Sequence, residues 1–442
     1  MILKHFSLVA SFVALAGTAL AAQPPAAPAA PTEPPAPPLD WAKLEAPFVT
    51  GQKQVTFRDK YVKAGESYFS SDGKWVIFQA VEVPGKDKEP DGFYAMYVAR
   101  LEGNAFTKVE RVSPAGSANT CGWFHPTEPG IVLFGSTLVA PKDEGPAGYQ
   151  RGTSKYRWAF PAEMEVVVAR VDAVGAEQSR DPVKYRKLGT PQYDFGLKGS
   201  YAKPVFSRPN YDAECSFDKS GRFLLYSHIE DAPKGDEGKA HGQVAHAAKA
   251  DANIYIYDMK TRKQYPIVVA PGYDGGPFFG PDGRSICYRS DRKGNDLLQI
   301  FVADLKFEKG EDGVEVPVGI TQEYQLTDNE HVSWCPYWHP SGKFMVYATS
   351  EVSHANYEVF AIEIDRVKLG EAAKGGGGAS VKVAGARTRR ITSADGADVL
   401  PAFNTDGSRV IWTSQRGPKI DGEMKPSSQL WIADWKGDPF AK

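Results

Sequence analysis

The pattern of hydrophobic and polar positions repeats six times along the chain. In each copy an aromatic residue precedes a polar turn that contains glycine, and a run rich in Val, Ile, Tyr and Trp follows. The three clearest copies begin at residues 279–283, 338–342 and 403–407. Glycine suits the turn because it can adopt a positive φ, and β-branched and aromatic residues suit the strand after it. Each copy therefore predicts a β-hairpin.

Three weaker copies lie upstream and begin at Phe69, Phe124 and Phe217. The steps between consecutive aromatic anchors are 55, 93, 62, 59 and 65 residues. Each copy continues into a third strand, such as Ile-Phe-Val-Ala-Asp at 300–304, and then into a short fourth strand. Four antiparallel strands per repeat are typical of one propeller blade. The fold class predicted is therefore all-β, a six-bladed β-propeller of four-stranded antiparallel blades.

The two ends of the repeat array complement each other. The last repeat has three strands, which end at Trp435, and residues 53–57 precede Phe69 much as residues 389–392 precede Phe403. A strand from the amino-terminal end that completes the last blade would close the ring and cover two sheet edges. We expect residues 53–57 to supply it, and the alternative is an edge strand without a partner.

These repeats resemble the TolB-type propeller repeat, also called the PD40 or WD40-like repeat. The similarity rests on the x-Pro-Asp-Gly turn, on Ser290-Asp-Arg292 after it and on the Ile-x-Val-x-Asp strand, with further likeness at 211–214 and 272–279. It covers roughly residues 50–436. We expect no counterpart of the separate amino-terminal domain of TolB. The resemblance implies a docking platform in the cell envelope.

The amino terminus predicts export. Lys4 and His5 precede an apolar run at 6–16, and Ala-Leu-Ala at 19–21 is a small-x-small cleavage pattern. The run is shorter than the roughly 20 residues that cross a bilayer, although a short membrane anchor is the alternative. We predict a signal peptide at 1–21, a Pro/Ala-rich tether at 22–50 and a propeller at 51–436, in a periplasmic or secreted protein without a membrane span after cleavage.

Charge and cysteine content exclude several classes of protein. The 52 Lys and Arg residues nearly balance 54 Asp and Glu residues, with a formal net charge of −2, which argues against a nucleic-acid partner. Four cysteines are too few for a disulfide-stapled miniprotein. Cys121 and Cys215 fall on neighbouring blades and could pair in an oxidising compartment, while buried free thiols are the simpler expectation.

Strand parity predicts that the larger insertions share one face. If the innermost strands begin at the top, the glycine turns lie at the bottom, and residues 140–163, 190–211 and 229–252 form top loops. The glycine-rich stretch at 375–378 indicates a flexible linker at the bottom. Within the first insertion, aromatic and cationic residues suit stacking on a sugar or peptide, although they could also pack on the rim. These residues are Tyr149, Arg151, Tyr156, Arg157 and Trp158.

One residue in each copy should stand at the upper mouth of the channel, five positions before the aromatic anchor. In chain order these are Ala64, Asn119, Asp212, Asp274, Ser333 and Asp398. Three aspartates beside a low-dielectric channel could hold a divalent cation such as calcium, or meet an amine or a basic peptide. The alternative is that each aspartate caps its own turn.

Catalytic motifs are scarce in this sequence. No G-x-S-x-G elbow, H-E-x-x-H, P-loop or dinucleotide fingerprint occurs. Some hydrolases carry a catalytic domain after a similar propeller, and we expect none here. His331 and His354 are weak candidates for metal ligands. We therefore expect a non-catalytic platform that binds an envelope protein or peptide at the top face. The alternative is a metal-dependent lyase or hydrolase that acts on a glycan there.

Overall fold

The computed structural model describes residues 39–142, 148–149, 156–157, 160–181, 185, 195, 197, 202–230, 251–295, 297–376 and 378–441. The predicted signal peptide and the first part of the predicted tether, residues 1–38, lie outside the described residues. One compact unit spans Leu39–Lys442. It opens with the short helix α1 (Trp41–Glu45), whose amino terminus is capped by Asp40.

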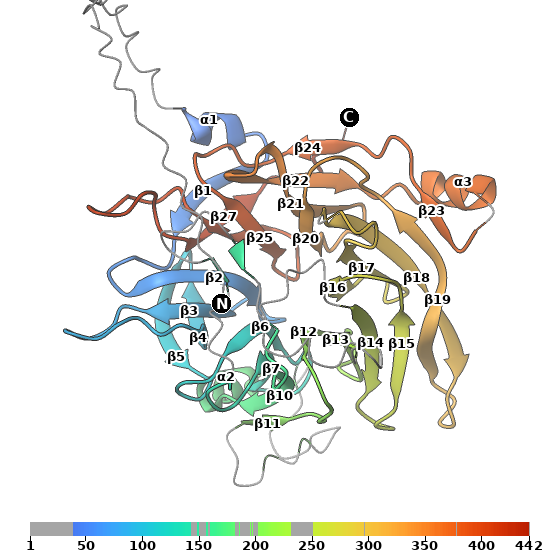
Figure 1. The fold of residues 1–442 in the computed structure, drawn as a ribbon, viewed down its shortest axis with the longest axis horizontal. Coiled ribbons are helices and arrows are strands. Elements are labelled where there is room, and N and C mark those ends of the chain that lie inside the picture. The colour runs from blue at the N-terminus through green and yellow to red at the C-terminus, as the bar shows by residue number, and fades with distance from the viewer. Residues whose placement is uncertain are drawn as a thin grey trace, which may run out of the picture. The chain divides into compact units, whose positions relative to one another are not determined.

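Six sheets surround a central axis (Figure 1). Blade one contains β2 (Tyr61–Phe69), β3 (Trp75–Glu82), β4 (Ala95–Glu102) and β5 (Ala105–Arg111). Blade two contains β6 (Asn119–Phe124), β7 (Ile131–Ser136), β10 (Glu165–Arg170) and β11 (Ala202–Pro204). Blade three contains β12 (Asp212–Phe217), β13 (Phe223–Ile229), β14 (Ala252–Asp258) and β15 (Gln264–Val268).

The carboxy-terminal half supplies the other three blades. Blade four contains β16 (Asp274–Phe279), β17 (Ser285–Ser290), β18 (Gln299–Lys309), β19 (Glu315–Gln325) and β23 (Ser380–Lys382). Blade five contains β20 (Ser333–Trp338), β21 (Phe344–Ser353), β22 (Asn356–Glu363) and β24 (Thr388–Arg390). Blade six contains β25 (Asp398–Phe403), β26 (Arg409–Ser414), β27 (Gln429–Trp435) and β1 (Val49–Gln54). The predicted six-bladed propeller is confirmed.

Blade four departs from the four-strand rule. Its fifth strand, β23, runs parallel to the outer strand β19. The chain reaches this edge through helix α3 (Arg366–Gly376), which buries Leu369. The expectation of a flexible linker at 375–378 was therefore wrong for Gly375 and Gly376, which end this helix. The excursion covers the outer edge of blade four, and so hides backbone groups that an open edge would expose.

The amino-terminal strand closes the ring. β1 pairs antiparallel with β27, from Val49 opposite Trp435 to Gln54 opposite Trp431, and Figure 1 shows blue β1 beside red β27. The predicted closure is confirmed, but the strand begins at Val49 and not at Lys53. Val49 extends it because its side chain is 1% exposed and packs into the apolar cluster of Trp412 and Trp435.

The top face is the end at which the inner strands β2, β6, β12, β16, β20 and β25 begin. Strands β7 and β13 end at this face and β10 and β14 begin there, as expected for the loops at 140–163 and 229–252, although 231–250 lie outside the described residues. The first loop includes the small hairpin of β8 (Gly148–Tyr149) and β9 (Tyr156–Arg157). The expectation that 190–211 forms one top link was wrong in part: β11 lies within it as the fourth strand of blade two, so that only residues 205–211 link blades two and three at the top, and most of 190–201 lies outside the described residues. The segment before β11 therefore starts from the bottom, where helix α2 (Asp172–Gln178) accepts a hydrogen bond from Gly130.

Apolar layers fill the space between neighbouring blades. Between blades three and four, for example, Ile254 and Ile256 pack with Tyr288 and Phe301, all at most 3% exposed. Burial of such side chains stabilises each by about 1.5–3 kcal/mol. Of the three described helices, none has the length and apolarity needed to cross a bilayer.

Removal of β1 should destabilise the whole ring. A chain that starts at residue 55 leaves β27 with an open edge, so we expect a large fall in melting temperature and association through that edge. Thermal unfolding monitored by circular dichroism and sedimentation velocity measure the two effects. The control chain starts at Leu39. Equal melting temperatures for both chains would contradict a stabilising closure.

Candidate functional site: the upper channel and its rim

A bulge recurs in the inner strand of every blade. The residue three positions before each aromatic anchor has φ between 41° and 59°, and the pairing with the second strand shifts there. These bulge residues are Glu66, Cys121, Glu214, Gly276, Cys335 and Leu400. Five are not glycine, although a side chain in this left-handed region costs about 1 kcal/mol. Bulges re-aim side chains, and these lie on the strands that line the channel.

Two of the bulge residues bring carboxylates into the upper channel. Glu214 is 4% exposed and accepts hydrogen bonds from the Tyr273 hydroxyl at 2.6 Å, from the Gly276 amide and from the Arg289 guanidinium at 3.3 Å. Glu66 is 5% exposed and accepts a hydrogen bond from the Tyr68 hydroxyl at 3.1 Å. Among the described residues no cation forms an ion pair with Glu66. The negative charge of Glu214 is therefore balanced by Arg289, whereas that of Glu66 is not.

Burial sets the charge of Glu66. Removal from water raises the pKa of its carboxyl group, and the nearby Glu214 carboxylate raises it further, while hydrogen bonds and Arg289 act in the opposite direction. The protonated form is therefore favoured at Glu66 relative to an exposed glutamate. A bound cation would reverse this preference, because an opposite charge stabilises the ionised carboxylate.

The end of the largest top insertion covers this cluster. Phe160 packs its ring on Tyr211 and Tyr273, with centroid distances of 5.0 and 5.8 Å. Tyr211 is 2% exposed, and its hydroxyl has no hydrogen-bond partner among the described residues. Burial and the Glu214 charge both raise the pKa of this phenol. Two carboxylates and an unsatisfied hydroxyl group are therefore buried together near the upper ends of the inner strands.

Four aromatic rings form the floor beneath these groups. Tyr68, Trp123, Phe278 and Tyr337 come from blades one, two, four and five, each one residue before its anchor, and their centroids lie 5.1–6.4 Å apart. Mutual contact of rings from both sides of the axis fills the channel at this level. A ligand of the channel would therefore enter from the top.

The rim aspartates begin their inner strands as predicted, but their side chains are buried and paired. Asp212, Asp274 and Asp398 are each 0% exposed. Asp212 lies 3.1 Å from Arg208 and 3.0 Å from His228. Such pairs favour a structural role, because removal of one partner leaves an uncompensated buried charge. A binding role for the three aspartates stays a prediction.

Blades four and six share one arrangement, which we call the charge clasp: an aspartate, an arginine and a second acid. Arg292 pairs with Asp274 at 2.8 Å and with Glu323 at 2.7 Å. Arg416 pairs with Asp398 at 2.6 Å and with Glu45 at 2.9 Å. Burial raises the pKa of Asp274 to about 6 despite Arg292. In blade six the second acid comes from α1, so the clasp attaches the amino-terminal segment to the last blade.

The sequence contains a signal for the clasp that the aromatic–turn–glycine repeat alone does not reveal. The arginine follows the aspartate by the same interval in both blades, from Asp274 to Arg292 and from Asp398 to Arg416, and each arginine also donates to the serine two residues before it. The two other polar rim residues are also buried: Asn119 donates to the Tyr94 carbonyl, and Ser333 is 0% exposed.

The remaining candidates are only partly described. Arg151 and Trp158 lie outside the described residues, and for Tyr149, Tyr156 and Arg157 only the backbone of β8 and β9 is described.

His331 and His354 both lie at the top of blade five, and His354 contacts the Tyr357 hydroxyl at 3.2 Å. Over the described ranges no three His, Cys, Asp or Glu side chains are grouped to hold a metal ion; calcium at the channel mouth stays a prediction.

All four cysteines are buried free thiols. The Cys215 thiol contacts the backbone carbonyl of Cys121 at 3.8 Å, so the two residues, both within the described part of the chain, are neighbours as expected but form no disulfide bond. Burial raises the pKa of the Cys121 thiol well above its ordinary value. An inert thiol follows, because the thiolate is the nucleophile.

Comparison with known proteins gives similarity over parts of the chain. No protein family model matches the sequence. The chain is 24% identical over 194 residues to the uncharacterized peptidase YuxL of Bacillus subtilis, covering 40% of this chain and 27% of that protein. It is 33% identical over 97 residues to dipeptidyl-peptidase 5 of Porphyromonas gingivalis, covering 21% of this chain and 13% of that protein. This chain therefore matches well under a third of either relative's length.

Solved structures similar to this chain include TolB from Acinetobacter baumannii. That match has a TM-score of 0.42 and 12% sequence identity, and covers 85% of this chain and 63% of the other. The assignment of the present fold rests on the strand pairing described above.

Loss of a clasp aspartate should destabilise the fold. Asp398→Ala removes the carboxylate that accepts from Arg416 and from the Trp412 indole at 3.1 Å. We expect the free energy of unfolding to fall by about 3 kcal/mol, measured by urea denaturation. The control is Asp434→Ala, whose carboxylate is 59% exposed and lies 3.8 Å from Arg409. An unchanged unfolding free energy together with lost partner binding would support the rim as a binding surface.

The charge on Glu66 should make stability depend on pH. The pKa of Glu66 is raised in the folded state. Its contribution to the free energy of unfolding is therefore fully present below the ordinary pKa of 4.5 and is lost as the pH rises above that value. Glu66→Gln mimics the protonated form and does not titrate. We expect the variant to melt above the wild type at pH 8 and close to it at pH 5, by scanning fluorimetry at both pH values. A melting difference that is the same at both would contradict this account.

Proposed function

We propose that this protein is an exported, TolB-like propeller that binds a protein or peptide at its top face without catalysing a reaction. The observation that carries the proposal is the one-sided exposure of apolar side chains. Seven of the eleven large apolar side chains exposed among the described residues belong to top-face segments. They are Phe57, Val83, Val139, Val269, Val352, Ile420 and Met424.

Exposed apolar side chains gathered on one face are typical of interaction surfaces. Val139 and Val269 are 64% and 67% exposed and belong to the top connections of blades two and three. The rim aspartates near them already form ion pairs within the protein, with arginine or histidine. Apolar contacts at the rim would thus supply affinity, and the polar groups of the upper channel would supply orientation.

A peptide is the ligand class that the other observations favour. The upper channel offers carboxylate acceptors and the Tyr211 hydroxyl, unpaired within the described ranges, above an aromatic floor. These groups suit the amide and ammonium donors of a peptide. Both curated relatives are named peptidases, which supports peptides as the class of ligand. Export of the chain rests on the signal-peptide pattern at residues 1–21.

The test compares paired charge substitutions on the two faces. Val139→Asp with Val269→Asp alters the top face, and Val314→Asp with Val367→Asp alters exposed positions of the bottom face. The mature protein and both variants are used as baits in an envelope extract of the source cells, with crosslinking and mass spectrometry. We expect a protein captured by the wild type and the bottom variant to be lost, at least tenfold, from the top variant.

The wild type, the top-face variant and the bottom-face variant must have the same melting temperature, which shows that the substitutions leave the fold intact. Equal capture by all three baits, or loss from the bottom variant alone, would contradict a binding role for the top face.

A further inference from the structure

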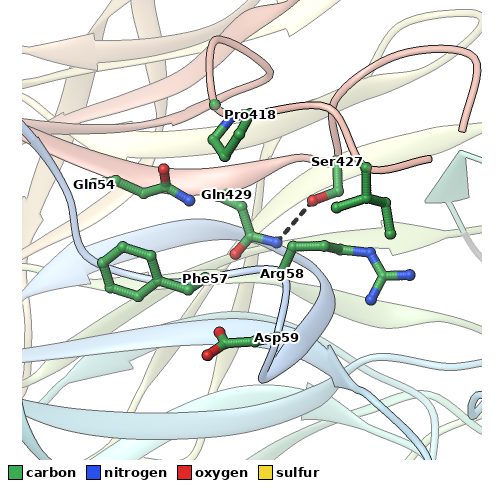
Figure 2. A pocket seen from close by; sticks show the side chains of 9 residues that line it. Gln54, Phe57, Arg58, Asp59, Pro418, Ser427 and Gln429 are labelled. Atoms are coloured by element: carbon green, nitrogen blue, oxygen red, sulfur yellow. Dashed lines mark hydrogen bonds between the residues drawn. The ribbon is translucent and has the colours of Figure 1, made fainter.

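A pocket of about 290 Å³ lies at the ring closure, on the top side of the junction between blades six and one (Figure 2). We call it the closure pocket. Its walls come from the end of β1 and the connection to β2, which contribute Gln54, Phe57 and Asp59, and from the loop between β26 and β27, which contributes Pro418 and Ile420. Gln429, the first residue of β27, completes it. Chain segments more than 350 positions apart thus form one cavity.

One buried polar atom in this pocket lacks a partner. Gln429 is 1% exposed, and its amide nitrogen donates to the Tyr61 carbonyl and to the Ser427 hydroxyl, both at 3.0 Å. These acceptors fix the orientation of the amide group. Its carbonyl oxygen has no hydrogen-bond partner in the described part of the chain, and in Figure 2 this oxygen lies on the side of Phe57 and Asp59. An unsatisfied buried acceptor destabilises the fold, and a ligand that donates a hydrogen bond to it would remove that cost.

The charge of the pocket is negative. Arg58 is neutralised by Glu423 at 2.9 Å, and the Glu423 side chain is 5% exposed. The Asp59 carboxylate is exposed, and among the described residues it forms no ion pair. The pocket therefore combines one uncompensated carboxylate with one unsatisfied amide oxygen. Both accept hydrogen bonds, so a complementary ligand carries donors and positive charge.

The apolar side chains in the walls indicate what kind of side chain the pocket would accommodate. Phe57 is 52% exposed and Ile420 is 39% exposed. An aromatic ring attracts a cation placed over its face, and apolar walls accommodate an aliphatic stem. A guanidinium group meets all these features, because it is planar, stacks on aromatic rings and presents several donors in a fixed fork.

We propose that the closure pocket binds the side chain of an arginine in a peptide. The guanidinium group stacks on Phe57, donates to the Gln429 carbonyl oxygen and pairs with Asp59, and the aliphatic stem contacts Ile420 and Pro418. This inference deepens the proposed function and rests on it, since it names one residue type in the peptide that the top face would bind.

The experiment uses small probes, so it does not depend on capture of a partner. The mature chain is titrated with N-acetyl-arginine methylamide, with the neutral citrulline analogue and with the lysine analogue, by saturation-transfer difference NMR. We expect saturable binding of the arginine probe, at least fivefold weaker binding of the lysine probe and none of the citrulline probe. Hydrogen–deuterium exchange should slow at residues 55–60 and 417–429 only when the arginine probe is bound.

Asp59→Asn should weaken the arginine probe about fivefold, the scale of an exposed ion pair. Phe57→Leu should weaken it by a similar factor through loss of the aromatic face. Both residues are exposed, so folding is retained, and a melting curve checks it. Asp421→Asn is the matched control: this aspartate is exposed on the loop between β26 and β27, next to Ile420, and does not line the pocket.

Three outcomes would overturn the assignment: equal binding of the citrulline probe, equal or tighter binding of the lysine probe, and an Asp59→Asn variant that binds like Asp421→Asn. The absence of saturable binding would also overturn it. These failures leave the proposed function standing if the top-face variant still loses its captured partner, and the two hypotheses are therefore separable.

Discussion

The pairing of β1 with β27 is the constraint on which the rest of this structure depends. A ring of six blades holds its shape only if the last blade meets the first, and here the fourth strand of blade six comes from the amino-terminal end. Backbone hydrogen bonds supply one part of this closure. The buried clasp of Glu45, Arg416 and Asp398 supplies another, because its side chains are at most 1% exposed and join α1 to the blade that β1 completes. A buried charge without its partner would be costly, so the clasp favours one register for the amino-terminal segment.

Closure of the ring determines the geometry of the channel. Each inner strand has the same bulge, so six positive-φ residues lie at one level around the axis. The four aromatic rings come two residues later in their strands and lie below that level. The strained backbone recurs at positions occupied by glutamate, cysteine and leucine as well as glycine. Because the side chain at this position varies while the backbone does not, the bulge belongs to the architecture, and the choice of Glu66 and Glu214 is particular to this chain. Strained positions of this kind are where function can be placed on a fixed scaffold.

Local pattern was sufficient to predict the blades but not the partners of their polar groups. The aromatic–turn–glycine repeat identified all six inner strands, and the position of Asp212, Asp274 and Asp398 at their first residues followed from it. Their burial did not follow, because the local sequence around an aspartate at a strand start is the same whether its carboxylate faces water or an arginine. The recurrence of arginine at one interval after Asp274 and Asp398 was the available signal. Glu45 had no such signal, since Ser393 and Arg416, which donate to its carboxylate, lie more than 340 residues away. The same holds for β23, which crosses to a blade other than its own.

The closure pocket arises from the same constraint as the ring. Gln429 begins β27, yet its amide nitrogen donates to the Tyr61 carbonyl of blade one, so this side chain bridges the junction that β1 makes possible. That hydrogen bond determines the orientation of the Gln429 amide group, and as a consequence its carbonyl oxygen faces the pocket. A ligand held there would contact both the amino-terminal connection and the last loop of the propeller. Ligand binding and ring closure would therefore stabilise each other, since by linkage any ligand that prefers the closed ring adds its binding free energy to the stability of the fold.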